Sequence, residues 1–305
     1  MTEAPPNGPS PTGDWFPGAA TLRTIGIVSP GAMGSALGRA WATGGARVVA
    51  TVAHRSLRTA RLAEGLELLS GLDGVVAASD LVVSICPPAA AGAVLEAVIG
   101  AARATGARPL LLEANALSPD QVTALAERAA SAGLDLVDGA VSGGPPSPDG
   151  DTVLYVSGAR ASEVAIVPAV GLGRSVVGDR VGTASAVKMC TASVYKGTTA
   201  IWAQALQTAA ALGVLTPVLA DLSEEFPAQV EGAGRRIAVA ASKSARFVDE
   251  MESIAATQGS AGASPELFEG VAAVYRRLSA TPLAALSPEE ASTLTDLRDA
   301  LDRLA

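Results

Sequence analysis

The sequence predicts an α/β domain with a doubly wound, mainly parallel sheet, followed by an all-α C-terminal domain. From about residue 23 to 183, short apolar runs alternate with helical stretches, which is typical of crossover units in a parallel sheet. Two runs, LVVSIC at 81–86 and PLLLE at 109–113, are almost continuously apolar, as strands covered on both faces are. After residue 183, β-branched runs give way to Ala, Leu, Arg and Glu at helical spacing.

The individual elements follow from these runs. We expect strands at 24–29, 47–52, 81–86, 109–113, 134–138, 152–157 and 174–178, with helices at 32–44, 57–66, 90–104, 119–132 and 161–170. In the C-terminal part, helices are expected at 184–213, 217–223, 225–240, 245–258, 264–279 and 288–303. The predicted organisation is a flexible Pro-rich leader at 1–22, the α/β domain at 23–183 and the helical domain at 184–305.

Composition excludes several classes of protein. The 305 residues are 49% hydrophobic and 17% charged, with a net charge of −8 and no basic stripe, which argues against a nucleic-acid surface. The first twenty residues lack the layout of a signal peptide. The apolar stretch 81–103 contains Pro87, Pro88 and Glu96, so it fits a strand, a turn and a helix better than a membrane span. We therefore expect a cytoplasmic protein without membrane contact.

Cysteine and histidine are too scarce for a metal centre. The two cysteines, Cys86 and Cys190, lie in a strand pattern and a helical pattern, and we predict that both are buried small hydrophobic residues. His54 is the only histidine, which excludes a zinc site built on several histidines. No metal ligand is predicted.

A glycine-rich turn follows the first strand and predicts a dinucleotide site. The general fingerprint G-x-G-x-x-G is represented here by Ser29, Pro30, Gly31, Ala32, Met33 and Gly34. Serine replaces the first glycine, but Gly31 would let the backbone approach a diphosphate, and Gly34 would let helix and strand pack closely. The unpaired N–H groups at the start of the 32–44 helix would bind the phosphates. The alternative is a helix–strand contact without a ligand.

The end of the second strand favours NADP over NAD. NAD-selective sites place Asp or Glu there to bind the ribose hydroxyls, but the segment 52–58 contains no acid. It supplies Arg55, Ser56 and Arg58, which suit a 2′-phosphate. The alternative is an ordinary solvated basic loop.

Three segments in order resemble the β-hydroxyacid dehydrogenase superfamily, which includes 6-phosphogluconate dehydrogenase-like enzymes and imine reductases. GIVSPGAMG at 26–34 resembles the cofactor turn, DGAVSGGPP at 138–146 the substrate-binding segment, and GTASAVKMC at 182–190 the segment with the catalytic lysine. YKGTTA and RFVDEMESIAAT resemble the helical domain of poorly characterised phosphogluconate dehydrogenase-like proteins. The resemblance covers about residues 23–280.

The resemblance implies a Rossmann domain and a set of site residues. It assigns catalysis to Lys188 and substrate binding to Ser142, Gly143 and Gly144. Pro87 and Pro88 are expected to shape the nicotinamide pocket, and Asn115 follows a strand at the edge where such sheets bind ligands. In relatives, helices of the second domain complete the site, often across a dimer, which points to Glu250 and Met251.

The lysines support this reading independently. Lys188, Lys196 and Lys243 are the only lysines of the chain, and Lys188 lies in an apolar helical stretch. Desolvation there would lower its pKa, so the amine could exchange protons near neutrality. The alternative is a lysine whose aliphatic stem lies along the domain boundary.

One position departs from the family pattern. Relatives usually place asparagine one turn after the lysine, where this chain has Thr191 and Ala192. Thr191 and Tyr195 share a helical face with Lys188, so Thr191 is a candidate substrate ligand. Tyr195 is either a second proton donor or a packing residue.

These observations predict an NADP-dependent oxidoreductase that transfers hydride between nicotinamide and a small carbonyl or hydroxy acid in the interdomain cleft. Imine reduction is the alternative within the enzyme class, because a protonated imine needs less oxygen positioning. A catalytically silent NADP-binding or scaffold protein is the alternative from another class. Apolar faces of the helical domain predict a homodimer.

Overall fold

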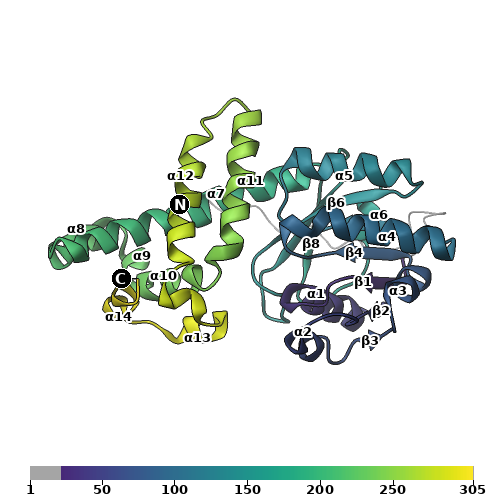
Figure 1. Cartoon of the computed structure of the whole chain (residues 1–305), viewed down its shortest axis with the longest axis horizontal. Coiled ribbons are helices and arrows are strands. Elements are labelled where there is room, and N and C mark those ends of the chain that lie inside the picture. The colour runs from purple at the N-terminus through teal and green to yellow at the C-terminus, as the bar shows by residue number, and fades with distance from the viewer. Residues whose placement is uncertain (1–21, 305) are drawn as a thin grey trace, which may run out of the picture.

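The computed structural model describes residues 22–304 and shows an eight-stranded sheet followed by a bundle of helices (Figure 1). We call β1–β8 with α1–α6 the sheet half and α7–α14 the helical half. All but the last residue of the predicted leader at 1–22 lies outside the described residues. The predicted fold class, a doubly wound sheet followed by helices, is confirmed. The division into domains at residues 183 and 184 stays a prediction.

The sheet has the strand order β3-β2-β1-β4-β5-β6-β7-β8. All neighbouring strands are parallel except β6 and β7, which are antiparallel. The strands are β1 Thr24–Ile27, β2 Arg47–Ala50, β3 Glu67–Leu68, β4 Leu81–Ser84, β5 Leu110–Glu113, β6 Leu136–Ser142, β7 Val153–Ser157 and β8 Gly173–Gly178. The order reverses between β1 and β4, and in open α/β sheets ligands bind outside the carboxyl ends of the strands at such a switch point.

Helices cover both faces of this sheet. The helices are α1 Ala32–Thr43, α2 Leu57–Leu62, α3 Leu72–Ala78, α4 Ala91–Thr105, α5 Pro119–Ser131 and α6 Ala161–Ala165, with a 3₁₀ turn at Pro88–Ala90. Residues of α1 and α6, among them Leu37, Trp41 and Val164, pack against one face. Residues of α3, α4 and α5 form a second core on the other face. The apolar runs of β4 and β5 are buried on both sides for this reason.

Helix α7 joins the two halves. It runs over Thr183–Ala211, packs against β6, β7 and β8 of the sheet, and also contacts α8, α10, α11 and α12. The remaining helices are α8 Leu215–Glu225, α9 Pro227–Glu231, α10 Ala233–Ala241, α11 Ser244–Ser260, α12 Glu266–Leu278, α13 Pro288–Thr293 and α14 Leu297–Asp302, with a 3₁₀ turn at Pro282–Ala285. In Figure 1 α11 and α12 stand side by side as an antiparallel pair that crosses α7.

Several element boundaries differ from the expectation. The helix expected at 161–170 ends at Ala165, because Pro168 disfavours helical geometry before it. The helices expected at 225–240 and 288–303 are each broken in two, at Gly232 and after Thr293. Two short elements, β3 and α3, were not expected. A strand of two residues and a helix of seven are too short to show a clear hydrophobic period.

The prediction for the cysteines is wrong in part. Cys190 is exposed, because it lies on the outer face of α7. Cys86 is only half-buried and follows the end of β4. Neither is a fully buried core residue.

Among residues 22–304, no helix combines the length and the apolar character that crossing a membrane requires.

Candidate active site

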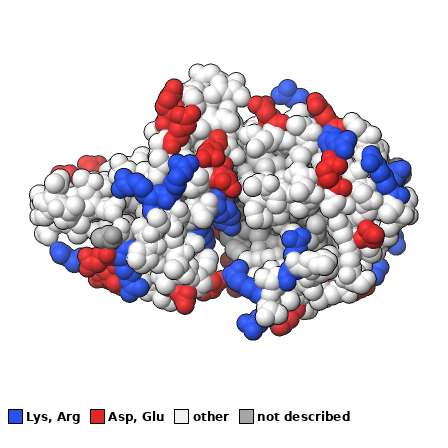
Figure 2. All heavy atoms as spheres, viewed as in Figure 1, with Lys and Arg blue, Asp and Glu red and all other residues white. Residues whose placement is uncertain are grey.

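A cavity of about 270 Å³ opens between the sheet half and the helical half. Figure 2 shows Lys and Arg side chains beside the hollow between the two halves. The sheet half contributes the residues that follow β1, β4, β5 and β6, and the helical half contributes α7 and the start of α11. The lining residues are Met33, Ile85, Cys86, Pro88, Ala114, Asn115, Ala116, Val141, Gly143, Lys188, Lys196, Lys243, Arg246, Phe247 and Glu250.

The turn at 29–34 lies at the switch point and fits a dinucleotide. A Cβ at Gly31 would meet no atom within 4 Å, so the space before this backbone is open. At Gly34 a Cβ would lie 2.4 Å from the Ser29 carbonyl oxygen, so the turn has no room for a side chain there. No side chain caps the N-terminus of α1, and the buried Ser29 Oγ has no hydrogen-bond partner. These free donors are the groups a diphosphate needs.

The basic segment after β2 lies on the surface. Arg55, Ser56 and Arg58 are exposed, and Ser56 Oγ caps α2 by accepting a hydrogen bond from the Thr59 amide at 3.2 Å. Arg58 lies 3.7 Å from Glu289 of α13, so this loop reaches the helical half. No acidic side chain stands in this segment.

Asn115 holds together the turns that follow β4 and β5. Its Oδ1 accepts from the Cys86 amide at 2.5 Å, and its Nδ2 donates to Ser84 Oγ at 3.1 Å. Pro88 begins a 3₁₀ turn directly beyond, and both residues line the cavity, whereas exposed Pro87 does not. The amide of Asn115 is thus engaged in shaping the wall.

A buried carboxyl lies beneath this wall. Glu113, at the end of β5, accepts a hydrogen bond from the Asn115 amide at 3.1 Å and is 3% exposed. Burial raises the pKa of Glu113 to about 7, since the ionised form loses its hydration. Near neutral pH this side chain therefore carries its proton for part of the time.

Lys188 reaches the cavity from the second turn of α7. Its Nζ donates to the Val141 carbonyl at 2.6 Å, which connects the lysine to the end of β6. Burial lowers the pKa of Lys188 from its usual 10.5, and the nearby Arg246 guanidinium lowers it further. The amine is therefore easier to deprotonate than an exposed lysine.

Asp138 fixes the start of α7, and with it the position of Lys188. This fully buried carboxylate in β6 accepts from the Gly182 amide at 2.9 Å, the Ser185 amide at 3.0 Å and Ser185 Oγ at 2.7 Å. It also accepts from Ser157 Oγ at 2.9 Å. Gly182 has no side chain with which to cap the helix, so Asp138 supplies the cap from the sheet.

The predicted substrate turn lies at the end of β6. Gly143 has φ of 104°, a left-handed conformation that favours glycine, and it lines the cavity. Thr152 Oγ1 donates to the Gly144 carbonyl at 2.8 Å and closes the turn. Ser142 ends β6 half-buried, and Ser142 and Gly144 adjoin the cavity without lining it.

Glu250 joins two cations of the opposite wall. It is 5% exposed, pairs with Lys196 Nζ through Oε2, and its Oε1 lies 3.4 Å from Arg246 Nε. Lys196 Nζ also lies 4.3 Å from the centre of the Phe247 ring. Burial and the three neighbouring cations lower the pKa of Lys196, while the Glu250 carboxylate favours its charged form.

Three predicted residues do not reach this cavity. Tyr195 is 70% exposed and does not line this cavity. Thr191 Oγ1 donates back to the Val187 carbonyl at 3.0 Å, so its hydroxyl is used within α7. Met251 is fully buried in the helical core.

From the helical half, the structure also adds four lining residues that the sequence patterns did not single out for the site: Lys196, Lys243, Arg246 and Phe247. The scarcity of lysine was the one available signal, because all three lysines of the chain line this cavity.

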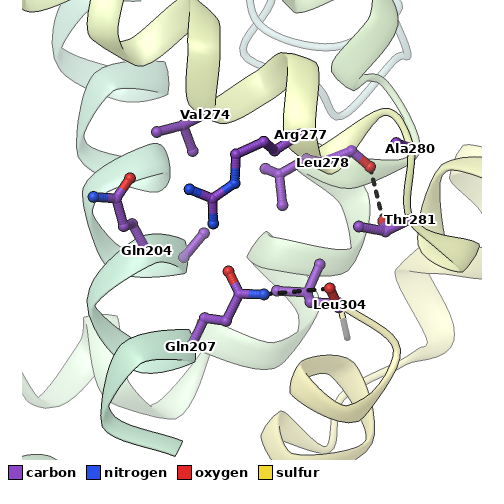
Figure 3. Close-up of a pocket in the computed structure, with 9 residues that line it drawn as sticks. Gln204, Gln207, Val274, Arg277, Leu278, Ala280, Thr281 and Leu304 are labelled. Atoms are coloured by element: carbon purple, nitrogen blue, oxygen red, sulfur yellow. Dashed lines mark hydrogen bonds between the residues drawn. The ribbon is translucent and has the colours of Figure 1, made fainter. Parts of the chain in front are cut away.

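A second cavity, of about 340 Å³, lies within the helical half (Figure 3). It is bounded by α7, α12 and the C-terminal segment, and Gln207 Nε2 donates to the Leu304 carbonyl at its edge. Arg277 is the one charged side chain among its described lining residues. It contains no pair of groups suited to acid–base chemistry.

The fold and the first cavity define a class of protein. A switch-point turn fitted to a diphosphate adjoins a wall with a half-buried amine, which is the arrangement of a dinucleotide-dependent oxidoreductase. Residues 24–171 match the NAD binding domain of 6-phosphogluconate dehydrogenase, and residues 209–278 match a domain of unknown function, DUF1932. These matches confirm the resemblance that the motifs predicted, to 6-phosphogluconate dehydrogenase-like proteins, and the chain is an NAD(P)-dependent dehydrogenase or reductase.

Solved structures share the fold over almost the whole chain. The conserved protein MTH1747, described as structurally similar to 3-hydroxyacid dehydrogenases, is 26% identical, with 84% of this chain and 96% of that chain covered and a TM-score of 0.61. Mycobacterium tuberculosis 3-hydroxyisobutyrate dehydrogenase with L-serine is 19% identical, with 89% and 98% covered and a TM-score of 0.64. A Streptomyces aurantiacus imine reductase is 22% identical, with 88% and 98% covered and a TM-score of 0.52. No curated protein sequence matches the chain.

Proposed function

We propose that this chain is an NADP-dependent oxidoreductase that transfers hydride between the nicotinamide and a small carbonyl or hydroxy-acid substrate in the first cavity. The observation that carries the proposal is the composition of that cavity. Met33 of the dinucleotide turn and Pro88 beyond β4 share it with the half-buried amine of Lys188. When bound, the cofactor supplies or accepts the hydride, and the chain must then supply or accept one proton.

Lys188 is suited to move that proton. In the reductive direction its ammonium donates a proton to the substrate oxygen as the substrate carbon gains hydride. In the oxidative direction the neutral amine accepts the hydroxyl proton. The lowered pKa of Lys188 makes its neutral form more accessible than that of an exposed lysine, and the Val141 carbonyl holds Nζ in place. The Gly143 turn lies beside this amine and offers backbone N–H groups to a substrate carboxylate.

The direct test replaces Lys188 by alanine. We expect turnover to fall about 10²- to 10⁴-fold, the usual contribution of a positioned acid or base, while NADPH affinity is retained. In the wild type, reduction should slow as the pH rises through the pKa of Lys188, and oxidation should accelerate, with both changes below pH 10.5. Unchanged turnover in Lys188→Ala would refute the role of the lysine. NADPH binding without turnover on a broad range of substrates would favour the catalytically silent alternative.

Imine reduction is the second candidate. The observation that favours it is at Thr191, where relatives usually place asparagine, because the Thr191 hydroxyl is bonded to its own helix and does not reach the cavity. A protonated imine needs no such oxygen ligand. Matched ketone and cyclic imine substrates distinguish carbonyl reduction from imine reduction. A higher kcat/KM for the imine would favour imine reduction.

The preference for NADP rests on the segment after β2. Arg55 and Arg58 are exposed beside the start of α2, where a 2′-phosphate would find two guanidinium groups and no opposing carboxylate in the segment. Glu289 competes for Arg58 at 3.7 Å, so Arg55 is the freer of the two. Equal or better kcat/KM with NADH would contradict this preference.

A homodimer is proposed from the outer face of the helical half. Val194 and Ile201 of α7 and Leu267 of α12 are each at least 60% exposed, and α7 and α12 form a largely apolar groove. A second copy would cover these side chains. Light scattering at micromolar concentration should give twice the chain mass, and Ile201→Glu should shift the protein towards a monomer.

A further inference from the structure

The helical half provides one wall of the first cavity. This wall carries more positive charge than the proposed proton transfer needs. Lys188, Lys196, Lys243 and Arg246 line it, and Glu250 is the one carboxylate among its described lining residues. Both oxygens of Glu250 are already approached, by Lys196 and Arg246. Within residues 22–304, no acidic side chain lies at ion-pair distance from Lys188 or Lys243. Positive charge is therefore left uncompensated.

The residue types distinguish this cluster of positive charges from an ordinary basic surface. Of the 22 basic residues of the chain only three are lysines, and all three line this one cavity. Elsewhere the chain uses arginine for its exposed charges. Burial lowers the pKa of each of these three lysines, and Arg246 lowers each further, whereas Glu289, beyond ion-pair distance, raises the pKa of Lys243. Cations that destabilise one another in this way are stabilised by a bound anion.

We propose that Lys243 and Arg246, beside Lys188 and Lys196, form a subsite for a second anionic group of the substrate, either a phosphate ester or a second carboxylate. This inference rests on the proposed function, because the subsite adjoins the proposed proton donor. It adds a substrate class, since the Gly143 turn already offers N–H groups to one carboxylate. The phosphates of the cofactor have separate positions, at Gly31 and at the segment 55–58, and none of these residues lines the cavity.

The geometry favours a compact anion. At about 270 Å³ the cavity is slightly smaller than the usual small-ligand site of about 300–1,000 Å³, so it suits a substrate of a few carbon atoms. Lys243 occupies the N-cap position of α11 and Arg246 follows one turn later, so both cavity-lining side chains come from one helix end. Lys196, positioned by Glu250 and the Phe247 ring, lines the same cavity.

The test titrates small anions into the NADPH-saturated full-length protein at constant ionic strength. The probes are inorganic phosphate, malonate and, as a monoanion control, acetate, followed by calorimetry. We expect phosphate or malonate to bind at least tenfold more tightly than acetate. Tighter binding of phosphate indicates a phosphate ester as the substrate group, and tighter binding of malonate indicates a second carboxylate. Equal affinity for all three probes would overturn the subsite.

Variants assign the binding to these residues. Lys243→Met and Arg246→Met should each weaken dianion binding at least tenfold, whereas Lys243→Arg should keep it within about threefold. Arg277→Met is the matched control, because Arg277 is the lone cation of the second cavity (Figure 3), and it should change nothing. Thermal melting confirms that each variant folds, and Lys243→Gln replaces Lys243→Met if that variant does not. Unchanged affinity in folded Lys243 and Arg246 variants would refute the proposal.

The same titrations separate this inference from the proposed function. If NADPH binds and the dianions do not, the subsite is wrong and the oxidoreductase proposal stands. If the dianions bind and NADPH does not, the proposed function fails while the anion subsite stands. If neither binds, both are wrong.

Discussion

The two walls of the active-site cavity are built from different chemistry. The wall from the sheet half consists of backbone turns and uncharged side chains such as Met33, Ile85, Pro88 and Asn115. The wall from the helical half contains all five charged residues that line the cavity: Lys188, Lys196, Lys243, Arg246 and Glu250. The division follows the fold, because strand ends and a helix N-terminus present backbone N–H groups without any charged side chain.

The difference matches the two tasks of the proposed function, cofactor binding and substrate chemistry. A cofactor that is the same in every turnover can be bound by main-chain groups, which depend little on side-chain identity. Substrate recognition and proton transfer need titratable groups, and the helical half supplies these from α7 and α11. Substitutions on the two walls should therefore affect different measurements.

The largest effect is expected where a charge of the helical wall loses its partner. Glu250→Gln should lower the free energy of unfolding by about 3–5 kcal/mol, because Lys196 and Arg246 lose the buried carboxylate between them. Chemical denaturation measures this loss. The matched control is Glu252→Gln on the same helix, where the exposed pair with Arg276 should contribute less than about 1 kcal/mol. Equal costs in the two variants would mean that the buried pair is not special.

A pH-dependent effect of similar size is expected beneath the sheet wall. The pKa of Glu113 is raised to about 7, so the contribution of this buried carboxyl to stability is full below pH 4.5 and is lost as the pH rises through 7. Glu113→Gln stays neutral at every pH. Between pH 4.5 and 8 the unfolding free energy of the wild type should therefore fall by about 3 kcal/mol relative to that of Glu113→Gln. Denaturation curves at several pH values provide the measurement. A difference that is the same at pH 5 and pH 8 would show that Glu113 ionises normally.

The smallest changes in stability concern the dinucleotide turn. Gly34→Ala should cost about 1–3 kcal/mol, because its Cβ would lie 2.4 Å from a backbone oxygen that cannot move freely. Gly31→Ala should leave stability almost unchanged, since a Cβ there meets open space, but it should weaken NADPH binding at least tenfold. Thermal melting and NADPH fluorescence separate the two effects. Normal NADPH affinity in Gly31→Ala would mean that the diphosphate binds elsewhere.

The sequence was most informative where a local pattern determines local structure. The apolar runs located seven of the eight strands, and the small residues at 29–34 predicted the turn that the structure places at the switch point. Helical spacing and the family motif together pointed to Lys188, and the structure places its amine in the cavity. These features depend on residues close together in the chain, so their pattern can be recognised without the fold.

Prediction from the sequence was weaker for side chains whose burial depends on which helix or strand packs over them. Lys188 and Tyr195 share a stripe of α7, yet Tyr195 is exposed while Lys196 lines the cavity. Helical spacing gives directions around an axis, but the packing of α11 against α7 decides which direction is buried. Cys190 was predicted buried and is exposed for the same reason.

The sequence by itself determined the order of strands and helices, the dinucleotide turn and the lysine of α7, because periodicity, glycine and family motifs act over short stretches of chain. Only the tertiary structure decided that all three lysines meet around one cavity, and that Asp138 holds the start of α7. These contacts join elements that lie far apart in the chain. They depend on the packing of α7 and α11 and on the contact of α7 with the sheet, which no single stretch of sequence specifies.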